Sequence, residues 1–225
     1  MIISTDWNLS LNMDDILHGQ GMDPQIVHTS KPSLLKAAER ALTEGMGLIH
    51  PMTLTSEVVI QEFRHERLLL AGGKALTGPL VVRQLSGAQR LVAAICTIGP
   101  ELEGATTQMF GEDPLYALAL DGLGNAAVEC LAQQVCSHIG EIVQAEGLQA
   151  STPLSPGYPE WPVEVGQPQI FTLLDPSKVG VTLTSGGMMI PKKSVSLVVG
   201  LGSEMSQAGM CTVCSLKETC RYQNA

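Results

Sequence analysis

Residues 155–162 read Ser155-Pro-Gly-Tyr-Pro-Glu-Trp-Pro162, and this stretch constrains the fold more than any other. Its three prolines remove backbone donors and fix φ, while Gly157 permits a φ above zero. No regular helix or strand needs such a sequence. We therefore predict a rigid loop that presents Tyr158 and Trp161 to a ligand. The alternative is a proline-rich turn that only joins two elements.

Three further blocks accompany this loop, and together the four resemble a known family. They are Gln167…Phe171-Thr-Leu-Leu174, Gly180-Val-Thr-Leu-Thr-Ser-Gly-Gly-Met-Met-Ile-Pro191 and Lys193-Ser-Val-Ser196. The set resembles the activation domain of vitamin B12-dependent methionine synthase, in particular short free-standing relatives with a C-terminal cysteine motif. The resemblance is dense over residues 153–202 and continues more thinly back to about residue 85. It implies an α+β fold with an antiparallel twisted sheet flanked by helices.

Composition excludes several classes of function. The chain has 225 residues, a formal net charge of −9, and 44% hydrophobic residues with only 4% aromatics. Nucleic acid is a poor partner for so acidic a chain, because phosphates favour clustered Lys and Arg. The first residues lack the pattern of a signal peptide, and no run of about 18 apolar residues indicates a membrane span. We therefore expect a cytoplasmic protein that contacts neither nucleic acid nor membrane.

The spacing of apolar residues and the positions of Gly and Pro predict the main helices and strands. Strands are expected at 54–60, 67–70, 179–184 and 194–200, with one strand at 90–98 that is buried on both faces. Helices are expected at 33–45, 76–85 and 167–174, and a long helix begins at the Asp113-Pro114 pair and continues to about residue 145. Gly122 and Gly124 within it indicate either a close approach by another backbone or ligand, or a kink.

We expect the chain to divide into three parts. Residues 1–85 are expected to form an N-terminal α/β segment, which is either a lobe of its own or part of a larger unit. Residues 86–202 form the core that resembles the activation domain, and residues 203–225 form a cysteine-rich tail.

The resemblance also implies a ligand site. In the family the Gly-Tyr-Pro loop lines an S-adenosylmethionine site, so Ser155, Pro156, Gly157 and Tyr158 are expected to contact that ligand. A helix carboxylate stabilises the positive charges of the ligand, and Glu129 aligns with it. The alternative for Glu129 is a solvated or helix-capping glutamate.

One position departs from the family pattern. The family has an Arg four residues before the loop glycine, where it pairs with the ligand carboxylate, and this chain has Pro153. Loss of such a charged hydrogen bond costs about 1.5–3 kcal/mol, or roughly one to two decades of affinity. Lys192 or Lys193 could substitute only as a point charge, without the planar fork of Arg.

The tail carries a second candidate site, Cys211, Cys214 and Cys220. Iron–sulfur clusters and structural zinc usually take four ligands, so a fourth is expected elsewhere, with Cys96 ahead of Cys130 and Cys136. We favour an iron–sulfur cluster over zinc, because reactivation of a corrinoid needs a low-potential electron and zinc has no redox chemistry. The alternatives are a reducible CxxC pair and thiols that bind nothing.

These expectations converge on an accessory protein of corrinoid-dependent methyl transfer. It would act in the reductive activation of a corrinoid-binding methyltransferase, with cobalamin supplied by that partner. The competing hypothesis is a non-catalytic interaction module with a structural zinc that docks on a corrinoid protein. An independent methyltransferase is a third possibility, but no residue set is suited to general-base chemistry, and we assign no catalytic residue.

Overall fold

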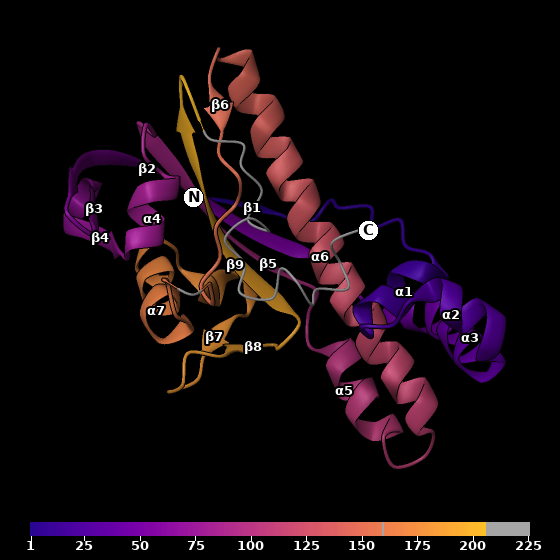
Figure 1. The fold of residues 1–225 in the computed structure, drawn as a ribbon. Helices are drawn as coiled ribbons and strands as arrows, with labels where there is room; N and C mark the ends of the chain where they lie inside the picture. Colours follow the sequence, from indigo (N-terminus) through magenta and orange to yellow (C-terminus); the bar gives the residue numbers. More distant parts are fainter. Residues whose placement is uncertain (159, 206–225) are drawn as a thin grey trace.

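The computed structural model describes residues 1–158 and 160–205, and its central feature is a seven-stranded sheet with helices on both faces (Figure 1). The strands of the sheet are β1 (Ile2–Ser4), β2 (Met52–Arg64), β3 (Arg67–Leu70), β4 (Lys74–Thr77), β5 (Arg90–Thr97), β6 (Gln149–Ala150) and β9 (Ser194–Gly202). Two short strands, β7 (Thr182–Leu183) and β8 (Met189–Ile190), form a separate pair. The α-helices are α1 (Met13–Gly19), α2 (Pro24–Ser30), α3 (Pro32–Arg40), α4 (Pro79–Gln84), α5 (Glu101–Met109), α6 (Pro114–Ala145) and α7 (Val163–Leu173).

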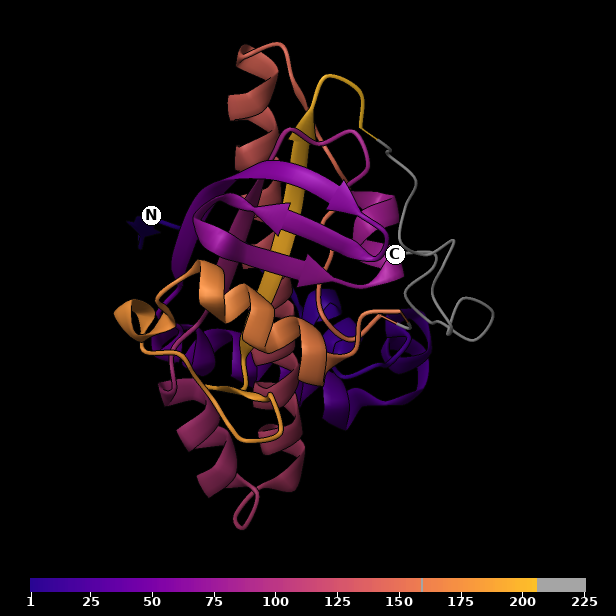
Figure 2. The same ribbon diagram turned by 90° about the vertical axis from the view of Figure 1, so that its left-hand side faces the viewer.

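The sheet is antiparallel throughout and strongly curled. Its strand order is β4-β3-β2-β5-β9-β6, and β1 pairs with β2 outside this order. The long strand β2 pairs with β5 over Met52–Val59 and with β3 from Ile60 onward, and its register shifts between Ile60 and Glu62. Such an irregularity bends a strand, and Figure 2 shows β2, β3 and β4 crossing in front of β9. The predicted α+β fold is therefore confirmed.

Strand β5 separates two hydrophobic cores. Its side chains alternate, so that Val92, Ala94 and Cys96 face one core while Leu91, Ala93 and Ile95 face the other. We call the first the α6 core, because α6, α1 and α3 cover it, and the second the α7 core, because α7, α4 and the β3–β4 hairpin cover it. The prediction of a strand buried on both faces is confirmed.

Helix α6 continues without interruption past Gly122, and helix α1 lies close to it there. A Cβ added at Gly122 would lie 2.5 Å from Cγ of Gln20 and 2.7 Å from the carbonyl oxygen of Ile16. At Gly19 an added Cβ would lie 2.3 Å from the carbonyl oxygen of Gly122. The close approach predicted from Gly122 is thus confirmed as a contact between the backbones of α1 and α6.

The predicted helix at 76–85 is only partly correct. Lys74–Thr77 is the edge strand β4, and the helix begins at Pro79. Gly78 separates the two with a φ of 145°, a value that side chains rarely allow. Pro79 then supplies the fixed φ of a first helical residue. Most other predicted elements agree with the structure to within a few residues, although the strand expected at 179–184 is only the two-residue β7.

Helix α6 is also long and apolar enough to cross a bilayer, judged by length and composition alone. In the structure 61% of its most apolar window is buried inside the protein. The core helix of a globular domain has the same character, so the helix is weak evidence for a membrane span.

Candidate functional site

The loop at residues 155–162 is anchored by Trp161. This indole is completely buried in the α7 core, and its Nε1–H donates to Oε1 of Gln169 on α7 over 3.3 Å. The same Oε1 accepts from the backbone N–H of Thr77 in β4 over 3.0 Å. One glutamine side chain therefore connects the loop, α7 and the edge of the sheet. The expectation that Trp161 faces a ligand is wrong, because its side chain fills the core.

Two backbone hydrogen bonds within the loop connect Gly157 and Tyr158 to Trp161. The N–H of Gly157 donates to the carbonyl of Trp161 over 2.8 Å, and the N–H of Trp161 donates to the carbonyl of Tyr158 over 2.9 Å. Gly157 adopts a φ of 112°, as the sequence predicted. Helix α7 packs flush against the loop at Gly166, where a Cβ would lie 2.8 Å from Pro156 and from the Trp161 ring. That the loop is rigid stays a prediction, which these contacts support for the described residues.

The residues that lead into the loop pair with strand β9. Leu154 exchanges two backbone hydrogen bonds with Val198 of β9, each 2.9 Å long, and both side chains lie in the α7 core. Pro153 and Ser155 on either side of Leu154 are half-buried. Tyr158 is half-buried against the α7 core. The loop thus begins beside β9 and leads to α7.

Glu129 lies on the α6 side of the sheet. Its side chain is exposed and, within the described part of the chain, forms no ion pair. It lines a hollow of about 770 Å³ between α1 and α6, together with Asp15, His18 and Cys130. Residues 155–158 do not line this hollow. The joint assignment of Glu129 and Ser155–Tyr158 to one ligand therefore stays a prediction.

Neither lysine proposed to replace the family arginine has an unpaired ammonium. Lys193 is 14% exposed in its side chain, and its Nζ lies 2.7 Å from a carboxylate oxygen of Asp121 and 2.7 Å from Oδ1 of Asn125. Lys192 pairs with Glu103 of α5 over 3.2 Å. Both lysines thus fasten the segment before β9 to α5 and α6. A cation that sequence reasoning missed is Arg83 of α4, which pairs with Glu160 of the loop over 3.0 Å.

The cysteines of the folded part are poor metal ligands. Burial raises the pKa of the Cys96 thiol to about 12 and that of Cys136 to about 11, and the negative charge of Glu129 adds to both shifts. Burial also raises the pKa of Cys130. A thiol must lose its proton to bind a metal. Among residues 1–158 and 160–205, no group of three His, Cys, Asp or Glu side chains could hold a metal ion. Cys211, Cys214 and Cys220 lie outside the described residues.

Replacement of Gln169 tests whether its hydrogen bonds to Trp161 and Thr77 hold the loop in place. Gln169→Leu leaves the Trp161 indole N–H and the Thr77 N–H without their acceptor, and an unsatisfied buried donor costs about 1–3 kcal/mol. We expect the free energy of unfolding in urea to fall by that amount. The matched control is Gln144→Leu, the same chemical change at an exposed position of α6, which we expect to change it by no more than about 0.5 kcal/mol. A Gln169→Leu protein as stable as the control would show that the network does not hold the loop.

Comparison with known proteins supports the family resemblance and the fold. The family described as vitamin B12 dependent methionine synthase, activation domain, matches residues 115–213. No curated protein matches the sequence. A crystal structure of the MetH reactivation domain bound to AdoHcy (S-adenosylhomocysteine) superposes with a TM-score of 0.64 at 16% identity, covering 89% of this chain and 73% of that one. The chain therefore resembles the activation domain of B12-dependent methionine synthase, in sequence over residues 115–213 and in fold over most of its length.

Proposed function

We propose that this chain is an activation module for a corrinoid-dependent methyltransferase. It would dock on the corrinoid-binding partner, in the cytoplasm, while the cobalt of that partner is reduced by one electron and then methylated. The methyl donor would be S-adenosylmethionine, which becomes S-adenosylhomocysteine when its methyl group leaves. The observation that supports this most is the coincidence of the family match with a fold whose related structure is described with AdoHcy bound.

The loop at Ser155 and Pro156, together with Glu129, is suited to contact part of S-adenosylmethionine. Ser155 and Pro156 lie at the sheet edge on a loop fixed by Trp161 and by the flush contact with Gly166. A preformed loop loses little conformational freedom when it binds a ligand. The exposed carboxylate of Glu129 on α6 is a suitable partner for an ammonium or sulfonium group. Pro153 cannot pair with a carboxylate, so we propose weaker binding than a loop with Arg at this position would give.

Calorimetry with both ligands tests the site. We expect S-adenosylmethionine and S-adenosylhomocysteine to release or absorb measurable heat, and Glu129→Gln to weaken S-adenosylmethionine about two- to five-fold more than S-adenosylhomocysteine. The reason is that only the former carries the sulfonium charge, and an exposed charge pair contributes about 0.2–1 kcal/mol. Glu141→Gln, an equal charge change on the exposed surface of α6, should leave both affinities unchanged.

A second variant addresses Pro153. Pro153→Arg supplies the planar fork that the family uses, so we expect both ligands to bind about tenfold or more tightly. Absence of heat at millimolar concentrations of either ligand, with the wild type and with Pro153→Arg, would refute the ligand site. The proposed docking on a corrinoid protein would then have to be tested without a ligand.

We further propose that Cys211, Cys214 and Cys220 bind an iron–sulfur cluster that would deliver an electron to the partner. Protein purified without oxygen should contain iron and acid-labile sulfide and absorb near roughly 400 nm, as thiolate-ligated iron does. Cys214→Ser should lose both, whereas Cys130→Ser should keep them, because burial holds that thiol protonated. Zinc without visible absorbance would instead support a structural metal and an interaction module. Iron retained by Cys214→Ser would place the cluster elsewhere.

A further inference from the structure

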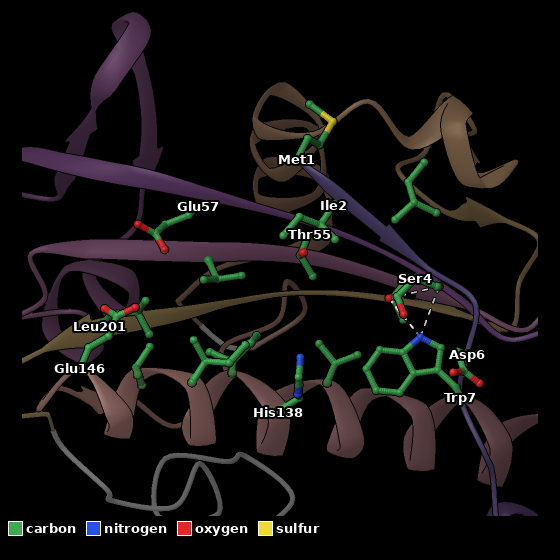
Figure 3. A pocket seen from close by; sticks show the side chains of 17 residues that line it. Met1, Ile2, Ser4, Asp6, Trp7, Thr55, Glu57, His138, Glu146 and Leu201 are labelled. Atoms are coloured by element: carbon green, nitrogen blue, oxygen red, sulfur yellow. Dashed lines mark hydrogen bonds between the residues drawn. The ribbon is translucent and has the colours of Figure 1, made fainter.

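A separate cavity of about 580 Å³ lies between α6 and the strands β1, β2 and β5 (Figure 3). Its interior is apolar and is formed mainly by buried side chains, namely Val92, Val135, Ile139, Val143 and Leu201. The short strand β1 closes it on one side, and the side chains of Ile2 and Ile3 remain exposed there. Neither Glu129 nor residues 155–158 line this cavity, so it is distinct from the site discussed above.

One end of the cavity combines an aromatic ring with a carboxylate. The indole of Trp7 is fixed in orientation, because its Nε1–H lies 3.2 Å from Oγ1 of Thr53 and 3.3 Å from the carbonyl of Ser4. The ring of His138 packs against it edge-on, with centroids 6.4 Å apart and an interplanar angle of 87°. Asp6 lies beside Trp7 and is exposed (Figure 3). An indole face next to a carboxylate is a favourable environment for an organic cation.

The other acidic side chains around the cavity are Glu57 and Glu146, and the N-terminal residue Met1 also lines it. Glu57 and Glu146 lie at the opposite end (Figure 3), and both form ion pairs with Arg90. In the described part of the chain, no lysine or arginine lines the cavity itself. Arg90 thus balances much of the charge at that end, whereas Asp6 forms no ion pair among the described residues, so a cation would meet complementary charge at the Trp7 end.

We propose that this cavity binds a small organic ammonium ion with an apolar, chain-like body. The charged head would lie at Asp6 and the face of Trp7, and the body would extend along the Val and Ile side chains of α6. The volume is within the range of about 300–1,000 Å³ that is usual for small-molecule sites, and a mostly apolar lining with few polar groups is typical of them.

Three probes with the same six-carbon body test the proposal, namely hexylammonium, 1-hexanol and hexanoate. Each is titrated into the full chain while tryptophan fluorescence is recorded. Trp161 is completely buried in the other core, so the response should come from Trp7 and disappear in Trp7→Phe. We expect hexylammonium to bind most tightly and hexanoate least. Asp6→Asn should reduce the preference for hexylammonium over hexanol about two- to five-fold, as expected for one exposed charge pair.

Two controls locate the binding. Glu39→Gln, an exposed carboxylate on α3 away from the cavity, should leave the preference unchanged. Val143→Phe fills the interior and should weaken all three probes, and a thermal unfolding curve shows whether that variant is folded. The proposal is overturned if no probe changes the Trp7 signal, if hexanoate binds as well as hexylammonium, or if Asp6→Asn, which alters only an exposed side chain, leaves the preference intact.

Discussion

The architecture depends on the burial of β5 on both of its faces. Because its side chains alternate between two cores, each face must be covered, and the chain supplies α6 for one and α7 with the β3–β4 hairpin for the other. Burial of this much aliphatic surface is the main stabilising term available to a chain with few aromatic residues. The neighbouring strand β9 follows the same alternation, with Leu197 and Val199 in the α6 core and Val198 in the α7 core.

This layering also explains where the candidate ligand loop lies. Leu154 pairs with Val198, and Trp161 enters the α7 core, so the loop between them is fastened at both ends while it turns around the sheet edge. Its hydrogen bond to Gln169 connects it to β4, which the sequence places far away. The loop is therefore held in place by the contacts of Leu154 and Trp161 with the hydrophobic core. Such preorganisation is what a ligand-positioning loop requires.

The fold was largely predictable, because its determinants are local in sequence. The apolar run at 90–98 and the Asp113-Pro114 start of α6 each depend on neighbouring residues. The site was less predictable, because its determinants are long-range. Trp161 was expected at a ligand, but its partner Gln169 and the space at Gly166 and Gly78 place it in the core. Lys193 was one of two lysines considered as a partner for the ligand carboxylate, and it pairs with Asp121. The cavity beside Trp7 joins residues more than 40 positions apart, which no local pattern reveals.

We propose that the loop at residues 155–158, rather than the cavity beneath β1, holds the adenosyl ligand. A crystal structure of the full chain soaked with S-adenosylhomocysteine tests this directly. We expect electron density for the ligand against Ser155–Tyr158, with its ammonium group toward Glu129. Density in the cavity beside Trp7, or a Glu129 carboxylate directed away from a ligand bound at the loop, would contradict it.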